Sequence, residues 1–163
     1  DYALNKVVET FSELADYGQG YNASVGIEGA YGHVCYCVER LNEAIKSINK
    51  SNTKVVFDLY NYLSCDNFEQ RYQILGNGLK LFENNIVAYH LKDCIVDGNK
   101  LVRCSVGKGI FDYERILSAI YEVDSNASLV LEGTCGEDIA NSVEFIRKIM
   151  SKIETNNNKS NKE

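Results

Sequence analysis

Four short apolar segments of this chain each end in a residue that can bind a metal ion. Each segment is a run of three or four apolar residues. The next residue in each case has a carboxylate or an imidazole, and these residues are Glu28, Asp58, His90 and Glu132. A short, fully apolar run between helical segments is typical of a buried parallel strand. The carboxyl ends of parallel strands meet at one face of an α/β sheet or barrel, where active sites are built. The pattern therefore predicts a site for one divalent cation with a ligand from each of four strands.

The segments around these runs have helical periodicity. Apolar residues recur on one helical face in segments 3–17, 34–49, 68–82, 113–120 and 137–152. We predict strands at 24–28, 54–58, 86–90 and 128–132, and a long connection from Lys92 to Phe111. Asp66 and Asp112 are placed to cap the third and fourth helices, and two glycines, Gly76 and Gly78, weaken the third. A helix followed by four strand–helix units predicts an α/β fold with a parallel sheet and helices outside.

The number of strands raises the question of how the sheet closes. Four parallel strands leave two unpaired edges, which soluble proteins normally avoid. We therefore expect residues 1–152 to form half of a (β/α)8 barrel of TIM type. The alternatives are a complete small four-stranded α/β domain, or a half-barrel that closes by dimerising. The Asn- and Lys-rich residues 153–163 are expected to be a disordered polar tail.

Composition excludes several classes of function. The chain has 163 residues and a formal net charge of -6, which argues against a dominant electrostatic grip on nucleic acid or anionic membrane. No apolar stretch approaches the roughly 20 residues that span a bilayer. The six cysteines are read as free thiols, because a chain of this length with an α/β pattern does not need a disulfide framework. We expect a cytoplasmic protein.

Several motifs resemble the xylose-isomerase-like TIM barrels. They are Ile27-Glu28-Gly29 with Gly32-His33 behind it, Val56-Phe57-Asp58-Leu59-Tyr60-Asn61, His90-Leu91-Lys92-Asp93, Gly107-Lys108-Gly109 and Leu131-Glu132-Gly133. This superfamily includes sugar-phosphate isomerases and epimerases, inosose dehydratases and apurinic endonucleases. The resemblance covers about residues 20–150 and implies that they are barrel strands five to eight, the C-terminal half. It also implies that Glu28, Asp58, His90 and Glu132 are the metal ligands, and that the two glutamates act as acid and base.

The chain departs from the family pattern at two positions. Many members have proline after the first glutamate, where this chain has Gly29, and keto-sugar epimerases often have histidine where it has Asn61. The second departure weakens an assignment to the keto-sugar epimerases. The nuclease branch uses additional histidines for a trinuclear zinc site. This chain has two histidines in all, which argues against membership of that branch.

The donor set predicts the metal and the chemistry. Three carboxylates and one imidazole favour Mn²⁺, or Mg²⁺, over a thiolate-bound metal, and Co²⁺ or Zn²⁺ also fit. A hydroxy-ketone would chelate the cation through adjacent oxygens, so that the metal stabilises the enediolate formed on proton loss. One ligand glutamate, Glu28 or Glu132, would take that proton and the other return it.

Four further residues are candidates for substrate binding, each with a structural alternative. His33 contacts substrate or caps the next helix, and Asn61 binds a sugar hydroxyl or closes a turn. Lys92 contacts a substrate oxygen or phosphate, and Asp93 orients His90 or binds a hydroxyl, unless the two form a salt bridge at the strand end.

We therefore expect a metal-dependent sugar or sugar-phosphate isomerase or epimerase. The alternatives are an inosose-type dehydratase with the same metal site and a non-catalytic half-barrel binding module. The expected partners are a small sugar or sugar phosphate, and either a homodimeric copy or a missing N-terminal half that completes the barrel. Activity of this chain alone stays open.

Overall fold

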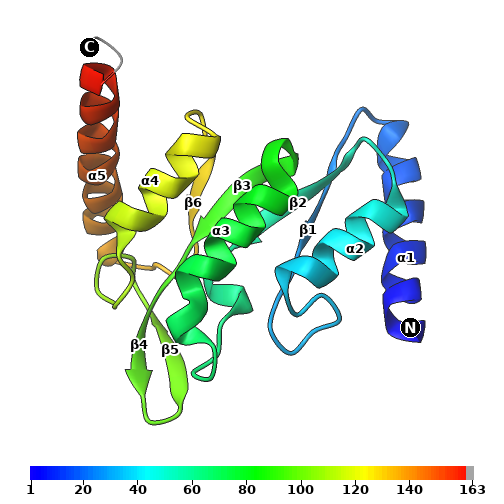
Figure 1. The fold of residues 1–163 in the computed structure, drawn as a ribbon, viewed down its shortest axis with the longest axis horizontal. Coiled ribbons are helices and arrows are strands. Elements are labelled where there is room, and N and C mark those ends of the chain that lie inside the picture. The colour runs from blue at the N-terminus through cyan, green and yellow to red at the C-terminus, as the bar shows by residue number, and fades with distance from the viewer. Residues whose placement is uncertain (161–163) are drawn as a thin grey trace.

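The computed structural model describes residues 1–160 and contains one parallel sheet with helices packed on one face (Figure 1). The sheet order is β1 (Val25–Glu28), β2 (Thr53–Asp58), β3 (Ile86–Leu91) and β6 (Leu129–Leu131). The helices are α1 (Tyr2–Gln19), α2 (Val38–Ile48), α3 (Arg71–Phe82), α4 (Tyr113–Val123) and α5 (Asp138–Ser160). Among the described residues, no helix combines the length and apolar character that crossing a bilayer requires.

The strand register staggers the strand ends along the sheet. Glu28 lies opposite Val56, two residues before Asp58, whereas Asp58 lies opposite His90. His90 lies opposite Val130, two residues before Glu132. Because side chains alternate along a strand, a stagger of two residues keeps them on one face. A stagger of this kind is what closing a sheet into a barrel requires.

The opposite face of the sheet carries the apolar core. Val55, Phe57, Tyr89 and Leu91 are all buried, and helices α2, α3 and α4 cover this face (Figure 1). Gly78 of α3 lies so close to Phe57 that a Cβ atom built on it would be 2.3 Å from the ring. The glycine that weakens helix propensity therefore allows α3 to approach the sheet.

The predicted order of one helix and four strand–helix units is confirmed. The third helix differs in its start, because a separate 3-10 turn (Phe68–Gln70) precedes α3 and the N-cap is Gln70, not Asp66. The second helix begins at Val38, four residues later than predicted. Asp112 caps α4 as expected, since its carboxylate accepts the Arg115 N–H at 3.0 Å.

The long connection predicted from Lys92 to Phe111 contains an antiparallel hairpin. Strand β4 (Asp93–Asp97) pairs with β5 (Lys100–Cys104), and the two residues that join them are Gly98 and Asn99. Gly98 has a positive φ of 56°, which glycine adopts without steric cost. A Gly-Asn pair between two strand-like runs is a hairpin signal, so the sequence contains the signal for this element.

The tail predicted to be disordered is helical over most of its length. Helix α5 continues to Ser160, eight residues beyond the predicted end at 152. Ile146, Ile149 and Ile153 are buried and follow one another at helical spacing, so the apolar face of α5 extends past that point. Residues 161–163 of the predicted tail lie outside the described residues.

The close packing of α3 on β2 gives a matched pair of substitutions. Gly78→Ala forces the new methyl group against Phe57 and is expected to destabilise the fold by about 1–3 kcal/mol. Gly76→Ala, in the same helix with open space around the added Cβ, is expected to stabilise by about 0.5–1 kcal/mol. Urea denaturation of both variants measures the difference, and equal effects of the same sign would contradict the packing account.

Candidate metal centre

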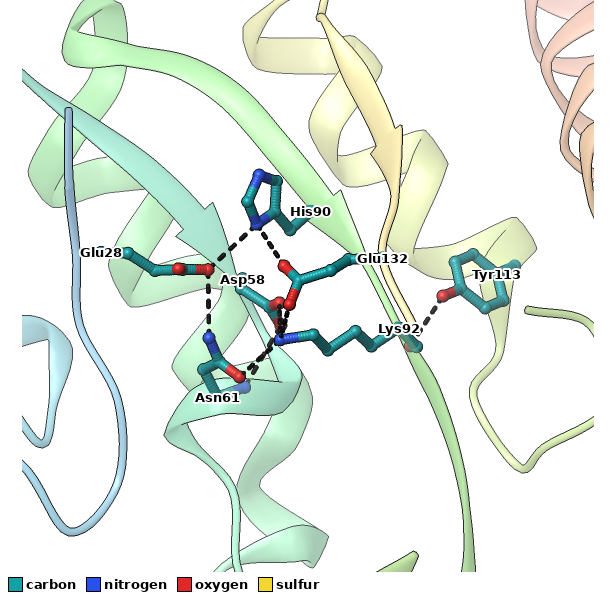
Figure 2. A network of polar contacts seen from close by, with 7 residues as sticks. All are labelled: Glu28, Asp58, Asn61, His90, Lys92, Tyr113 and Glu132. Atoms are coloured by element: carbon teal, nitrogen blue, oxygen red, sulfur yellow. Dashed lines mark hydrogen bonds and ion pairs between the residues drawn. The ribbon is translucent and has the colours of Figure 1, made fainter. Parts of the chain in front are cut away.

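Four ligand-type side chains converge at the carboxyl ends of the four parallel strands. Glu28, Asp58, His90 and Glu132 each offer one ligand atom, and these atoms all lie within 4.8 Å of one another. Figure 2 shows the four side chains pointing toward one another. Asp58 and His90 lie opposite each other in the register, whereas Glu28 and Glu132 are each displaced by two residues and reach the same centre from the two outer strands. The geometry predicted from the strand ends is therefore present.

His90 lies between the two glutamates. Its Nδ1 atom is 3.1 Å from Glu28 Oε1 and 2.6 Å from Glu132 Oε2. Glu28 comes from β1 and Glu132 directly follows β6, which are the two outermost strands of the sheet. The two carboxylates therefore approach the centre from opposite sides.

Lys92 supplies a positive charge within the cluster. Its Nζ atom lies 3.0 Å from Asp58 Oδ2, 2.8 Å from Glu132 Oε1 and 2.9 Å from Asn61 Oδ1. Its side chain is only 5% exposed, so its ammonium group interacts with these atoms rather than with bulk water. Because residues two apart on a strand face the same way, Lys92 shares the side of the sheet that carries His90.

Asn61 connects the carboxylates of Asp58 and Glu28. It lies in a 3-10 turn (Tyr60–Tyr62) that begins two residues after the end of β2. Its backbone N–H donates to Asp58 Oδ1 at 3.2 Å, and its side-chain amide donates to Glu28 Oε1 at 3.0 Å. A carboxylate that accepts the N–H three residues later stabilises the start of a turn. Asp58 therefore orders the turn that positions Asn61.

Burial and charge act in opposite directions on the carboxyl groups. Burial raises the pKa of Asp58 to about 6, although the contact with the charged Lys92 acts to lower it. Burial also opposes ionisation of Glu132, but Lys92 and His90 outweigh it and hold the pKa of Glu132 below its ordinary value. Burial acts to lower the pKa of Lys92, but Glu132 and Asp58 outweigh it and raise that pKa, so Lys92 stays protonated.

Two oxygen atoms of the cluster suit a metal ion. Asp58 Oδ2 and Glu132 Oε2 are buried and accept no hydrogen bond of good geometry, although Lys92 Nζ and His90 Nδ1 lie within ion-pair distance of them. A buried carboxylate oxygen without a hydrogen bond is costly unless it binds a cation. Three carboxylates and an imidazole also match the donors that Mn²⁺, Mg²⁺ and Zn²⁺ accept. The residues present therefore fit a divalent cation.

The four residues predicted to bind substrate lie in different surroundings. Asn61 and Lys92 belong to the cluster, as described above. His33 is exposed and lines a hollow of about 500 Å³ that Glu28 and Asn61 also line. Asp93 lies elsewhere, and it does not form the salt bridge with Lys92 that was considered as an alternative, since Lys92 pairs with Asp58 and Glu132.

Asp93 holds the loop between β5 and α4. Its carboxylate is 1% exposed and accepts four backbone N–H groups, from Cys94, Gly107, Gly109 and Phe111, at 2.9–3.2 Å. A Cβ atom on Gly109 would lie 2.0 Å from Asp93 Oδ1. The Gly-Lys-Gly motif thus lets the backbone wrap around a buried carboxylate. Both oxygens of Asp93 are used, so its observed role is to hold the loop.

Two hydrogen bonds that support the centre could not be predicted from the sequence. Tyr113 donates a hydrogen bond from its hydroxyl to the carbonyl oxygen of Lys92 at 2.8 Å (Figure 2). Thr134 Oγ1 accepts the Val106 N–H at 3.2 Å, which ties the Asp93-bound loop to the segment after Glu132. Both contacts join residues far apart in the sequence, and no local pattern marks either of them.

The raised pKa of Asp58 predicts an observable titration. Carbon NMR of the side-chain carboxyl in the metal-free chain should show a midpoint near 6 instead of 3.8. Because Lys92 lowers this pKa, Lys92→Met should move the midpoint upward, while Lys80→Met, on an exposed face of α3, should leave it in place. A midpoint that falls on removal of Lys92 would contradict the assigned charge balance.

The hydrogen bonds of Asp93 predict a loss of stability on substitution. Asp93→Asn places an amide against backbone N–H groups that need acceptors, and should destabilise the fold by about 2 kcal/mol in urea denaturation. Asp97→Asn, at the exposed end of β4, is the matched control and should change stability little. If both variants are equally stable, the carboxylate does not hold the loop.

The fold has relatives among known proteins. The model of the xylose isomerase-like TIM barrel family matches residues 1–149. A comparison with curated protein sequences gives no significant match. Among solved structures, the chain is similar to a xylose isomerase domain protein from Planctomyces limnophilus, with a TM-score of 0.75 and 18% identity over 93% of this chain and 53% of that one.

Two further solved structures show the same fold. A xylose isomerase-like TIM barrel protein from Mycobacterium smegmatis, in complex with magnesium, gives a TM-score of 0.74 at 13% identity over 94% of this chain and 52% of that one. A D-tagatose 3-epimerase-like protein gives 0.73 at 18% identity over 94% and 56%.

The extent of these matches fixes the architecture. The chain spans about half the length of the solved structures it matches, and its four parallel strands account for half of an eight-stranded barrel. The family match covers most of the chain. The chain therefore belongs to the xylose isomerase-like TIM barrel family, of which it forms a half-barrel.

Proposed function

We propose that this half-barrel carries the metal and acid–base centre of a sugar or sugar-phosphate isomerase or epimerase. The observation that carries the proposal is the convergence of Glu28, Asp58, His90 and Glu132, whose ligand atoms lie within 4.8 Å of one another. Membership of a family whose solved relatives include a D-tagatose 3-epimerase-like protein supports a carbohydrate substrate.

The four residues would together hold one divalent cation. Their oxygen-rich donor set leads us to propose Mn²⁺, with Mg²⁺, Co²⁺ and Zn²⁺ as alternatives. The magnesium complex of the Mycobacterium smegmatis protein is consistent with such a hard cation in this fold. When bound, the cation would polarise the carbonyl of a hydroxy-ketone and stabilise the enediolate that forms on proton loss.

The two glutamates would move the proton. Glu28 and Glu132 come from opposite sides of His90, so one can take a proton from the carbon next to the carbonyl while the other returns it to the opposite face. The depressed pKa of Glu132 keeps it ionised, which a base requires. Lys92 holds Asp58 and Glu132 in place during this transfer.

The substrate would lie beside Glu28. The hollow of about 500 Å³ that His33, Asn61 and Glu28 line is open to solvent and next to the metal ligands. We propose that His33 and Asn61 contact sugar hydroxyls there, and that Lys92 contacts a substrate oxygen from within the cluster. The chain supplies only half of a barrel wall, so we expect metal binding without efficient turnover until another half-barrel or a second copy completes the wall.

Metal titration of the full chain tests the assignment directly. Glu132→Gln removes a charged ligand and should lower the Mn²⁺ affinity measured by calorimetry by at least about tenfold. Glu122→Gln, on the exposed face of α4, is the matched control and should bind like the unaltered chain. Equal Mn²⁺ affinity of the two variants would show that Glu132 is not a ligand.

Isotope exchange tests the chemistry separately from the metal. Incubation with ketoses in deuterated water should incorporate deuterium next to the carbonyl, slowly with this chain alone and not at all with Glu132→Gln. Analysis of the products distinguishes an isomerase or epimerase from a dehydratase, because only the dehydratase releases water from the substrate. If the protein binds metal but incorporates no deuterium, even in a completed barrel, it is a binding module and not an enzyme.

A further inference from the structure

The hairpin of β4 and β5 projects beyond the carboxyl ends of the parallel strands (Figure 1). It begins directly after Lys92, and the Tyr60 hydroxyl donates a hydrogen bond to the carbonyl oxygen of Leu101 in β5 at 3.1 Å. Tyr60 follows Asp58 by two residues, and Lys92 Nζ lies 5.9 Å from the centre of its ring. The hairpin is therefore attached to the segment beside the candidate metal centre.

The register of the hairpin determines which way Arg103 of β5 is directed. Arg103 lies opposite Cys94 and two residues after Leu101 on the same strand. Opposite residues of an antiparallel pair, and alternate residues of one strand, have their side chains on the same side. Cys94 is fully buried and Leu101 packs against the core. Arg103 therefore belongs to the side of the hairpin that faces the body of the protein.

The side chain of Arg103 lies at the rim of the centre. A Cβ atom on Gly133, the residue after Glu132, would be 3.8 Å from Arg103 Cδ and would contact no other atom within 4 Å apart from its neighbours in the chain. The charge of Arg103 also acts on Tyr60: burial raises the pKa of this hydroxyl, and the charges of Arg103 and Lys92 act to lower it. Arg103 is therefore close to the centre and has open space beside it.

The connection between β3 and α4 contains four cationic residues, and two of them already have carboxylate partners. Lys92 and Lys108 form ion pairs with carboxylates of the chain. The side chains of Lys100 and Arg103 form no ion pair or hydrogen bond with any residue that the structure describes. Lys100 lies near the turn of the hairpin, on the side opposite to Arg103. Arg103 is therefore the cation at the rim that is available to an anion from outside the chain.

The charges of the centre allow an anionic substrate to approach. Lys92 and a bound divalent cation would together offset the carboxylates of Glu28, Asp58 and Glu132, so the loaded centre has no excess negative charge that repels an anion. The hollow proposed for the sugar hydroxyls lies beside Glu28, whereas Arg103 lies beside the residue that follows Glu132. A substrate chelated between the two glutamates would extend its far end toward Arg103.

We infer that Arg103 binds an anionic group of the substrate, a phosphate ester or a carboxylate, at the end of the molecule remote from the hydroxy-ketone. A guanidinium presents paired N–H donors that match the oxygens of either group. The inference rests on the proposed function, which places the hydroxy-ketone on the metal. It narrows the substrate from sugars in general to acidic sugars, and it makes Arg103 the residue that selects them.

Calorimetry with the full chain loaded with Mn²⁺ tests the role of Arg103. The probes are D-fructose 6-phosphate, 5-keto-D-gluconate and uncharged D-fructose, which are all hydroxy-ketones. The unaltered chain should bind at least one acidic sugar at least about tenfold more tightly than fructose, and the preferred probe identifies the group as a phosphate or a carboxylate. Arg103→Gln should lose this preference without a change in fructose binding, and Arg103→Lys should retain part of it.

Lys100→Gln is the matched control, because it removes one positive charge from the other side of the same hairpin. This variant should bind all three probes like the unaltered chain, and Mn²⁺ affinity should be the same in every variant. An unaltered chain that binds Mn²⁺ but does not prefer an acidic sugar would overturn this inference alone, as would an Arg103→Gln variant that keeps the preference. An unaltered chain that binds no Mn²⁺ would overturn the proposed function together with it.

Discussion

Mutual repulsion among three carboxylates is the constraint on which the centre of this protein depends. Glu28, Asp58 and Glu132 are drawn together by the stagger of the parallel strands, and Asp58 is fully buried. Buried like charges are costly unless a cation or hydrogen bonds compensate them. Lys92 provides part of that compensation, and a divalent cation held by the same carboxylates and His90 would provide the rest.

The supporting structure follows from that constraint. Lys92 has to be held at the strand end, and the Tyr113 hydroxyl contacts its carbonyl oxygen. Its neighbour Asp93 turns the other way and collects four backbone N–H groups. The loop fixed in this way also contacts Thr134, two residues after Glu132. The His-x-Lys-Asp motif therefore combines a candidate metal ligand, a compensating charge and a loop anchor within four residues.

The sequence predicted the centre better than its surroundings. Apolar runs that end in ligand-type residues report directly on strand ends, so the convergence of Glu28 and His90 could be predicted without coordinates. The role of Asp93 could not, because its partners lie 14 to 18 residues away in a loop, apart from the adjacent Cys94. The helical extension beyond residue 152 was not predicted, because residues 153–163 are mostly polar and Ile153 is the one apolar residue among them that marks the buried helix face. The hairpin between β4 and β5, in contrast, has a local signal in its Gly98-Asn99 turn.

The open edges connect the architecture to the chemistry. The four residues that could hold a metal ion all belong to this half-barrel, whereas the wall facing them in an eight-stranded barrel consists of other strands. Under the proposed function, cation binding would therefore be separable from completion of the substrate site. This separation explains how a chain that spans about half of its solved relatives can retain a complete set of ligand-type residues.

The most direct measurement of the central claim is a crystal structure of the full chain with Mn²⁺, using anomalous scattering to locate the ion. The account predicts one anomalous peak within coordination distance of Glu28, Asp58, His90 and Glu132, with Lys92 still in contact with a carboxylate. An ion bound elsewhere, or carboxylates that move apart around an empty centre at saturating Mn²⁺, would contradict it.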